Sequence, residues 1–238
     1  MSTAETVRYV AYALYVISLV YAVVIVIPII TGNQISNKNK SSSGGSLSDS
    51  LDMINQWSEK ADEYEMNPGH SKRIASLAKQ IGEKYGLPKE DIDTIEYAAL
   101  LHDVGQIDNF EFITEARQIE LSERIRLEGH TILGEEFSRQ IPNLGNAPLW
   151  IKWHHERWDG MGYPDQLSGE MIPLPVRILS VADAYDSLIS ARPHREALSA
   201  EDAVKELQRM SGIMFDPNVI QVFMSIDSDV ESSRTLEV

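Results

Sequence analysis

Apolar positions recur at helical spacing along most of the chain after residue 66. Over residues 70–85, Ile74, Ala78 and Ile81 fall on one helical face, and Gly86 is a typical helix end. The same spacing predicts further helices over residues 89–104, 118–140, 146–157, 175–191, 200–211 and 217–226. Alternating strand patterns with hairpin turns are absent from the sequence. The pattern therefore predicts an all-α fold with one distinctive loop over residues 158–175.

An apolar run near the N-terminus follows a different pattern. Residues 9–30 contain no charge over 22 positions, and such a run matches the roughly 30 Å hydrocarbon core of a bilayer. A signal peptide would have a shorter apolar region and a small-residue cleavage site. A buried core helix would rarely be apolar on every face. We interpret residues 1–35 as a single transmembrane anchor, and Lys38 and Lys40 favour a cytoplasmic C-terminal part.

A polar segment separates this run from the helical region. Residues 36–50 contain seven serines and two adjacent glycines, a composition typical of a flexible linker. We therefore expect a folded domain over residues 51–227 and a tail over residues 228–238. Since no sensory domain fits between the membrane and the core, any regulatory signal is expected to arrive through partner proteins.

Composition limits the chemistry. The net charge of −15 argues against a nucleic-acid polymer as partner, because such a partner needs a basic surface. The chain has no cysteine, which excludes disulfides, thiolate metal sites and a cysteine nucleophile. A phosphate-bearing ligand must then be held by a few local cations or by metal ions.

Histidines supply the candidate chemistry. A lone buried histidine is commonly a core residue, but here five occur at or near the predicted helices, together with two aspartates in apolar surroundings. Burying such a carboxylate is costly unless it is paired or binds a metal. Mixed imidazole and carboxylate ligands suit iron, manganese, zinc or nickel, and a bridging carboxylate is typical of two-metal hydrolytic centres. The seven residues are His70, His102, Asp103, His130, His154, His155 and Asp183.

Three segments resemble a known family. Residues 102–106, HDVGQ, resemble the HD-x-G-K signature of the HD phosphohydrolase superfamily. Residues 154–164, HHERWDGMGYP, are similar to the HHE-x-WDG-x-GYP segment of its HD-GYP branch, and Asp183 followed by RPHR at 192–195 resembles a third segment. The resemblance implies an all-α HD-domain bundle with two or three metals, usually iron or manganese. It also implies hydrolysis of cyclic di-GMP to pGpG or GMP.

The resemblance also implies roles for individual residues. His102, Asp103 and Asp183 would hold one metal, and His130, His154 and His155 the second. Asp103 would bridge the two metals, which would activate a shared hydroxide for attack on phosphorus, and His70 would serve the first site or a third metal. Asp103 and Gln106 take the catalytic positions of the HD signature. Residues implied in substrate contact and in the GYP loop are Gly160, Gly162, Tyr163, Pro164, Arg192 and Arg195.

Three departures from the family pattern leave the seven candidate ligands intact but argue against a third metal and for altered substrate handling. Gln106 replaces the motif lysine, so a cation becomes a neutral donor. Met66 stands four residues before His70, where trinuclear members have a glutamate, although Glu65 is adjacent. Residues 107–121 lack the usual pattern of the pocket wall.

Two functional hypotheses follow. The first is a membrane-anchored, metal-dependent phosphodiesterase that hydrolyses cyclic di-GMP, with its HD-GYP-like domain in the bacterial cytoplasm. The alternative is a catalytically weak HD-GYP domain that binds or scaffolds a membrane protein complex. A third reading, an HD phosphohydrolase acting on another nucleotide, is disfavoured by the GYP segment. A homodimer is compatible with either of the first two.

Overall fold

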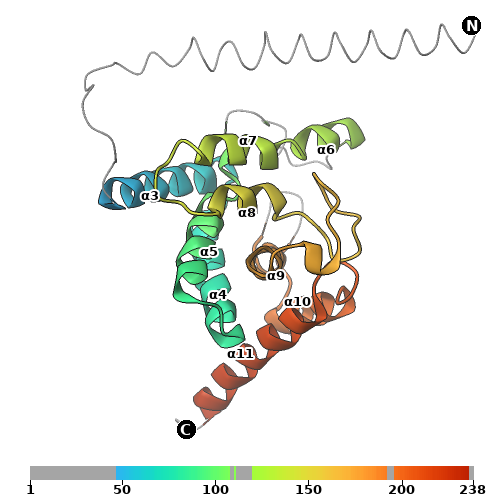
Figure 1. The fold of residues 1–238 in the computed structure, drawn as a ribbon. Coiled ribbons are helices and arrows are strands. Elements are labelled where there is room, and N and C mark those ends of the chain that lie inside the picture. The colour runs from blue at the N-terminus through green and yellow to red at the C-terminus, as the bar shows by residue number, and fades with distance from the viewer. Residues whose placement is uncertain (1–46, 108–109, 111–119, 192–195, 236–238) are drawn as a thin grey trace, which may run out of the picture. The chain divides into compact units, whose positions relative to one another are not determined.

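The computed structural model describes residues 47–107, 110, 120–191 and 196–235, with side chains described as far as Ile226. The described residues form helices and no named strand, so the all-α prediction is confirmed (Figure 1). The elements are α3 (Leu47–Tyr64), α4 (His70–Tyr85), α5 (Lys89–Leu101), η2 (Val104–Gln106), α6 (Leu121–Leu127), α7 (His130–Ser138), α8 (Ala147–Trp153), η4 (Gly169–Met171), α9 (Leu174–Ile189), α10 (Ala200–Arg209) and α11 (Pro217–Thr235).

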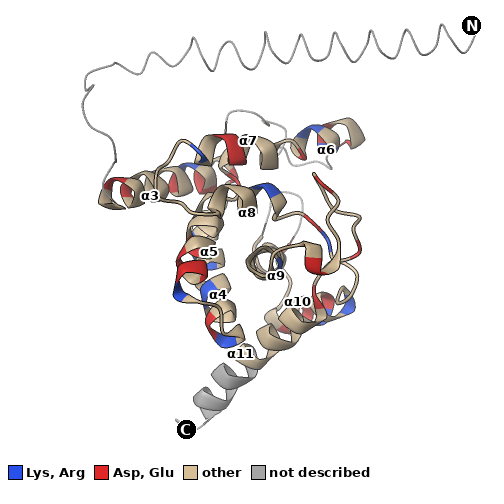
Figure 2. Cartoon of the chain, in the orientation of Figure 1, with Lys and Arg blue, Asp and Glu red and all other residues tan. Residues whose placement is uncertain are grey.

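The core lies between α4, α5 and α9. Helix α4 packs against α5, α9 and α11, while α7 packs against η2 and α8. Figure 1 shows α9 nearly end-on, between the α4–α5 pair and α10. Ile74, Ile95 and Leu179 are fully buried in this core. Charged residues of both signs occur on α3, α4, α5 and α10 (Figure 2).

Helix ends follow the sequence signals. Gly86 closes α4 in the left-handed conformation, with φ 91°, which glycine adopts without a steric penalty. The Ser199 hydroxyl caps α10 by accepting the Asp202 N–H at 3.1 Å. Asp216, just before α11, accepts the Asn218 N–H at 2.8 Å and binds the Arg177 guanidinium.

The predicted linker ends too late. Residues 36–46 lie outside the described residues, but residues 47–50 belong to α3, an 18-residue helix absent from the prediction. Its buried positions include Ser50, Ser58 and Asp62 beside Ile54 and Ala61. Polar and small residues on the buried face hide the apolar periodicity by which a helix is recognised. The predicted tail, residues 228–238, likewise begins inside α11, which continues to Thr235.

Three predicted helices end early or break near the histidines. Helix α5 stops at Leu101 rather than at residue 104, and α8 stops at Trp153 rather than at residue 157. The predicted 118–140 helix is two helices, α6 and α7, separated at Gly129. Glycine is among the residues least favourable to a helix interior, which accounts for the last break.

The predicted membrane anchor, residues 9–30, lies outside the described residues. Among the residues that the structure describes, no helix has the length and apolar character needed to cross a bilayer.

Candidate metal centre

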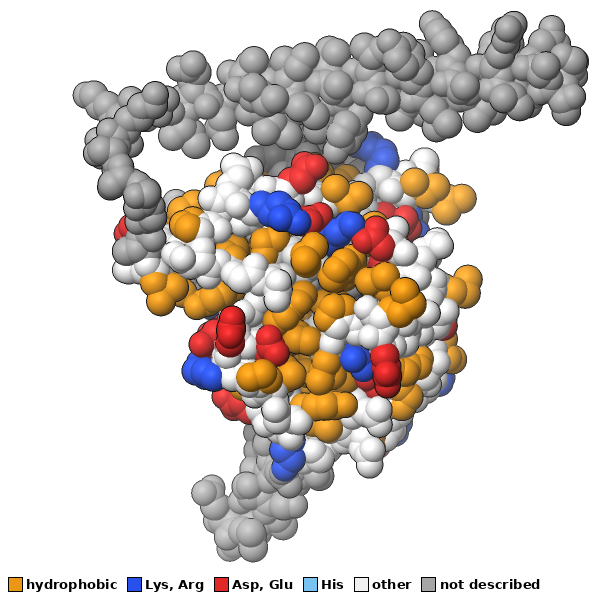
Figure 3. Space-filling model, in the orientation of Figure 1, with side chains coloured by type: hydrophobic (Ala, Val, Ile, Leu, Met, Phe, Trp, Pro, Cys, Tyr) orange, Lys and Arg blue, Asp and Glu red, His pale blue; other side chains and the backbone are white. Residues whose placement is uncertain are grey.

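Helix ends bring the predicted ligands together. His70 and His130 are the first residues of α4 and α7, and His102 follows the last residue of α5. His154 and His155 follow the end of α8, whereas Asp183 lies within α9. Five segments distant in sequence thus converge on one point. The described face in Figure 3 shows apolar and charged side chains but no histidine, in keeping with the burial of His70, His102, His130 and His154.

Asp103 joins two groups of candidate ligands. In one group, ligand atoms of Asp103, His130, His154 and His155 all lie within 4.8 Å of one another, and in the other the same holds for His70, His102 and Asp103. The Asp103 carboxylate oxygens lie 3.0 Å from His102 Nε2 and 3.2 Å from His130 Nε2. Asp183 lies beside the second group, with Oδ1 3.7 Å from His70 Nε2 and 3.9 Å from His102 Nε2. The Asp103 carboxylate is thus within reach of both groups, and its role as a bridge between two metals stays a prediction.

Backbone carbonyls orient three of the histidines. The Nδ1 atoms of His102, His130 and His154 each contact the carbonyl oxygen three residues earlier, at 2.9, 2.6 and 2.6 Å. Since a carbonyl only accepts, each Nδ1 carries the proton and donates. The Nε2 atoms of His130 and His154 then present lone pairs to the centre, and His102 Nε2 can do so once the proton that it shares with Asp103 is lost. A fixed tautomer of this kind is typical of metal-binding histidines.

The inward-facing atoms lack partners that a metal would supply. His70 Nε2, His102 Nε2 and Asp103 Oδ1 are buried without a hydrogen-bond partner in the described part of the chain. His130 Nε2 and His154 Nε2 face each other at 3.4 Å, although each bears a lone pair. Buried acceptors facing one another are unfavourable unless a proton or a cation lies between them. The residues present therefore fit divalent metal ions.

The pKa values of His154 and His155 favour neutral imidazoles, which can each offer a lone pair to a metal. Burial, and then the neighbouring His130 and His102, lower the pKa of His154 to about 4, and burial lowers the pKa of His155 well below its usual value. Burial also opposes protonation of His102, but the Asp103 carboxylate outweighs it and raises the pKa of His102 to about 10. Without metal, His102 therefore keeps the second proton of its imidazolium form at neutral pH, and metal binding must displace that proton.

Asp186 was missed by the sequence analysis. Its Oδ2 accepts from His70 Nδ1 at 2.6 Å. Arg73 donates to the same carboxylate twice, from Nε to Oδ1 at 2.6 Å and from Nη2 to Oδ2 at 2.9 Å. Burial opposes ionisation of Asp186, yet its bonds to His70 and Arg73 lower its pKa to about 2. Its position one helical turn after Asp183 is a signal that could have identified it.

Gly105 allows the helices that carry the ligands to meet. A Cβ at this position would lie 2.1 Å from the His130 carbonyl oxygen and 2.6 Å from the Gly134 nitrogen. Both contacts are with backbone, which has little freedom to move away. The glycine of the HD-x-G-K signature therefore lets η2 contact the first turn of α7, next to Asp103.

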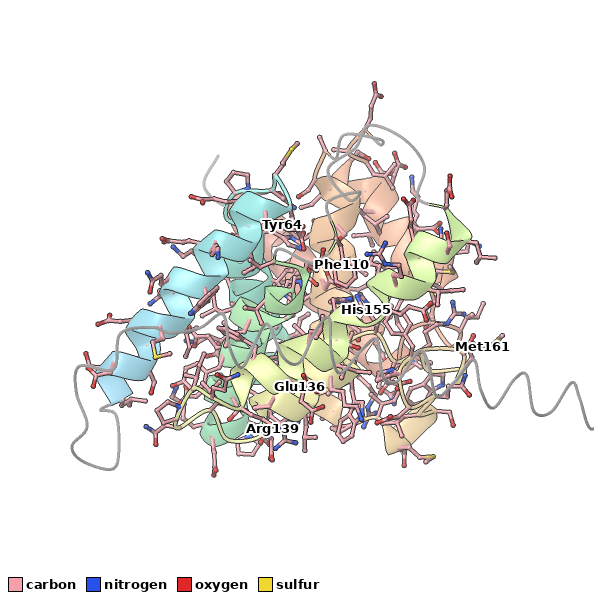
Figure 4. All side chains as sticks on the ribbon, turned by 90° about the horizontal axis from the view of Figure 1, so that it is seen from above. Tyr64, Phe110, Glu136, Arg139, His155 and Met161 are labelled. Carbon is pink, nitrogen blue, oxygen red and sulfur yellow. The ribbon has the colours of Figure 1, made fainter. Side chains whose placement is uncertain are left out.

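A cavity of about 550 Å³ opens beside the centre. Its volume falls in the range of roughly 300–1,000 Å³ that is typical of small-molecule sites. Its lining includes His154, His155 and Asp183, together with residues of α6, α9 and the GYP loop. The Tyr163 ring lies 5.1 Å from the His155 ring, and Tyr163 also lines the cavity. Figure 4 shows His155 in the interior and Met161 at the outer edge.

The predicted GYP loop, Gly160 to Pro164, borders this cavity. Gly160 has φ 78°, as expected of a position that needs glycine, but Gly162 requires glycine for another reason. A Cβ at Gly162 would lie 2.4 Å from the Arg157 nitrogen and 2.6 Å from the His155 carbonyl oxygen. Glu156, also missed, accepts the N–H groups of Asp165 and Leu167 just after the GYP residues, at 2.7 and 3.0 Å.

The remaining predicted residues contribute less to the metal centre. Gln106 is buried, and its N–H donates to the Asp103 carbonyl at 2.9 Å, but it supplies no positive charge. Met66 is exposed. Burial opposes ionisation of Asp103, but its contacts with His102 and His130, and to a smaller extent with Glu65, outweigh burial and lower the pKa of Asp103. Within residues 107–121, the Phe110 N–H donates to the Tyr64 hydroxyl at 3.1 Å (Figure 4). Arg192 and Arg195 lie outside the described residues.

Comparisons with known proteins show the family to which the chain belongs. The model of the HD domain matches residues 47–219. A cyclic di-GMP phosphodiesterase of Thermotoga maritima is 30% identical over 195 residues, covering 76% of this chain and 49% of the relative. The cyclic di-GMP phosphodiesterase response regulator RpfG of Xanthomonas campestris is 36% identical over 155 residues, covering 64% and 41%. The chain thus spans about half or less of the length of these curated relatives.

A solved structure shows the same fold. It is that of a cyclic GMP-AMP specific phosphodiesterase of Vibrio cholerae, with a TM-score of 0.58 and 24% identity. The alignment covers 77% of this chain and 49% of that one.

Proposed function

This chain belongs to the HD domain family, and we propose that it is an HD-GYP-type phosphodiesterase that hydrolyses cyclic di-GMP to pGpG or GMP. The observation that carries the proposal is Asp103, whose carboxylate is shared by two histidine groups beside a cavity that His154, His155 and Asp183 help to line. Two relatives at 30% and 36% identity carry the name of this activity.

Seven residues would hold two divalent metals. His70, His102 and Asp183 would bind one ion and His130, His154 and His155 the other, with Asp103 between them. Imidazole and carboxylate ligands suit iron, manganese, zinc or nickel, and the resemblance to HD-GYP proteins favours iron or manganese among them. When bound, the ions supply charge that acidifies a water molecule and offsets the charge of the phosphate.

The chain's own residues would then position the substrate. The Tyr163 side chain stays a hydroxyl donor, because burial and the nearby Asp103 raise its pKa above the usual value. It can therefore donate to a phosphate or ribose oxygen in the cavity. Gln106 can donate a hydrogen bond but no charge, and Arg192 and Arg195 are proposed to bind phosphate by their guanidinium groups.

Gln106 also supports a second candidate function. Without the motif lysine, a complete metal centre could bind the cyclic dinucleotide and turn it over only slowly. The domain would then act as a binding or scaffolding subunit of a membrane protein complex. Rates, rather than binding, separate the two candidates.

The location of the protein is part of the proposal. We propose that residues 9–30 anchor the chain in the bacterial cell membrane by a single span and that the HD-GYP-like domain lies in the cytoplasm. The support is the charge-free apolar run, followed by Lys38 and Lys40.

A hydrolysis assay tests the activity. The full chain, loaded with manganese(II) or iron(II), is incubated with cyclic di-GMP, and the products are separated by chromatography. We expect pGpG or GMP from the wild type, and none after chelation or from Asp103→Asn. Absence of turnover in fully loaded wild type would favour the scaffolding function.

A further inference from the structure

The last turn of α6 and the residue that follows it place charged side chains in the lining of the cavity. Arg124, Leu127 and Glu128 all contribute to the cavity lining. Arg124 and Glu128 are one helical turn apart and therefore share a face. Both also influence the Tyr163 hydroxyl, because Glu128 raises its pKa and Arg124 lowers it, after the larger effects of burial and Asp103. Their charged groups thus lie near the same part of the cavity.

Glu128 differs from the other carboxylates of the lining. Glu156 accepts the N–H groups of Asp165 and Leu167, and Asp183 lies among the candidate metal ligands. The half-buried Glu128 carboxylate has no hydrogen bond or ion pair within the part of the chain that the structure describes, not even with Arg124. A charged acceptor directed into a substrate cavity without a partner points to a donor on the substrate.

The chemistry of a cyclic dinucleotide limits which of its groups can be that donor. An ionised carboxylate only accepts hydrogen bonds and is repelled by phosphate, so it is suited to neither phosphate group. Guanine carries two adjacent donors, N1–H and the N2 amino group, on its Watson–Crick edge. Adenine has an acceptor at N1 and a single amino donor at N6. A carboxylate can therefore pair with the guanine edge through both oxygens, but not with adenine.

We propose that Glu128 is a specificity-determining residue that accepts N1–H and N2–H from one guanine of the cyclic dinucleotide. This proposal rests on the proposed function and specifies the base that the site selects. Arg124, with the same access to the cavity, is left to bind the phosphate or the O6 and N7 acceptors of the base.

The test compares two substrates in two variants. Glu128→Gln keeps the shape of the side chain but replaces one acceptor by a donor, and Glu128→Ala removes both. Glu136→Gln is the matched control, since Glu136 is an exposed residue of α7 outside the lining of the cavity (Figure 4). For the full chain at matched manganese content, kcat/KM is measured with cyclic di-GMP and with cyclic di-AMP. Dissociation constants for both are measured by calorimetry.

We expect the preference for cyclic di-GMP over cyclic di-AMP to fall roughly 10-fold or more in both Glu128 variants. The control should keep the wild-type preference. An equal loss for both substrates would place Glu128 against a ribose or in the metal site, and an unchanged preference would remove it from recognition. Either result overturns the proposal.

Failure of the proposed function gives a different result. If the wild type turns over neither substrate but binds cyclic di-GMP more tightly than cyclic di-AMP, the phosphodiesterase activity is refuted. The ratio of dissociation constants in Glu128→Gln then decides the role of Glu128. If the wild type binds neither dinucleotide, or binds both equally, guanine reading is refuted as well.

Discussion

Gln106 departs from the family signature in the substrate site, whereas the candidate metal ligands follow it. The seven candidate ligands are present and converge, yet the side chain next to them supplies no charge where the family signature has a lysine. Substrate phosphate gains negative charge as the bond to the attacking oxygen forms. A cation at this position would stabilise that charge more strongly than an amide does.

We therefore predict that Gln106→Lys raises turnover of cyclic di-GMP. Groups of this kind are commonly worth about 10²–10³ in rate, and the metals already offset much of the charge, so the lower end is expected. Steady-state assays at equal metal content should show the gain in kcat as well as in kcat/KM. A wild type that is already fast, or a lysine variant that changes nothing, would show that Gln106 does not limit the reaction.

Asp186 should matter for metal binding because it fixes the His70 ring. In Asp186→Asn we predict that metal affinity falls by about 10- to 100-fold, the usual effect of removing a carboxylate behind a metal-binding histidine. Elemental analysis and metal titration measure the loss. Glu83→Gln, an exposed change on α4, the helix that begins at His70, should leave metal content and metal affinity unchanged.

The same variant has a pH signature. The folded-state pKa of Asp186, about 2, is below the ordinary value of about 3.9, so its ionisation stabilises the fold above pH 4. That contribution is lost as the pH falls towards 2. Wild type should therefore lose unfolding free energy more steeply than Asp186→Asn between pH 4 and pH 2. Parallel pH profiles would contradict the role of this carboxylate.

Helix ends, more than helix interiors, build the site. His70, His102, His130 and His154 occupy first positions or the residue after the last turn, where the backbone can direct a side chain inward. Periodicity predicted that these helices exist and placed the start of α4 at His70. It extended α5 and α8 through His102 and His154, because apolar spacing does not report where a helix must stop to present a ligand.

Other features could not be predicted from apolar spacing. Helix α3 buries Ser50, Ser58 and Asp62, so its inner face reads as polar in the sequence. Glu128 looks like an ordinary surface residue of a helix until the fold places α6 beside the cavity. The ligands themselves were predictable because their motifs are compact, as in residues 102–106 and 154–164.

The close contact between η2 and α7 leads to a prediction about stability and metal content. Gly105→Ala should reduce stability by at least about 1–3 kcal/mol, the usual cost of overpacking, because its Cβ would meet backbone atoms on α7. Metal content should fall as well, since Asp103 precedes η2 by one residue. Thermal unfolding and elemental analysis measure both effects. An alanine variant with wild-type stability and metal content would show that the two elements are free to separate.

The division of the chain into an anchor and a metal-binding domain concerns the whole molecule. We predict that the intact chain is recovered with membranes and that deletion of residues 1–40 releases it while metal binding is retained. The deletion leaves α3 intact, since that helix begins at Leu47. Fractionation followed by immunoblotting tests this. Uncleaved full-length protein in the soluble fraction would refute the anchor.

The central claim is that two metals shared across Asp103 make this chain a cyclic di-GMP phosphodiesterase. The most direct test is a titration of the metal-free full chain with manganese(II), in which bound metal and hydrolysis are measured on the same samples. We predict that occupancy approaches two ions per chain and that hydrolysis rises chiefly with the second. Saturation below one ion, or hydrolysis that persists without metal, would contradict the claim.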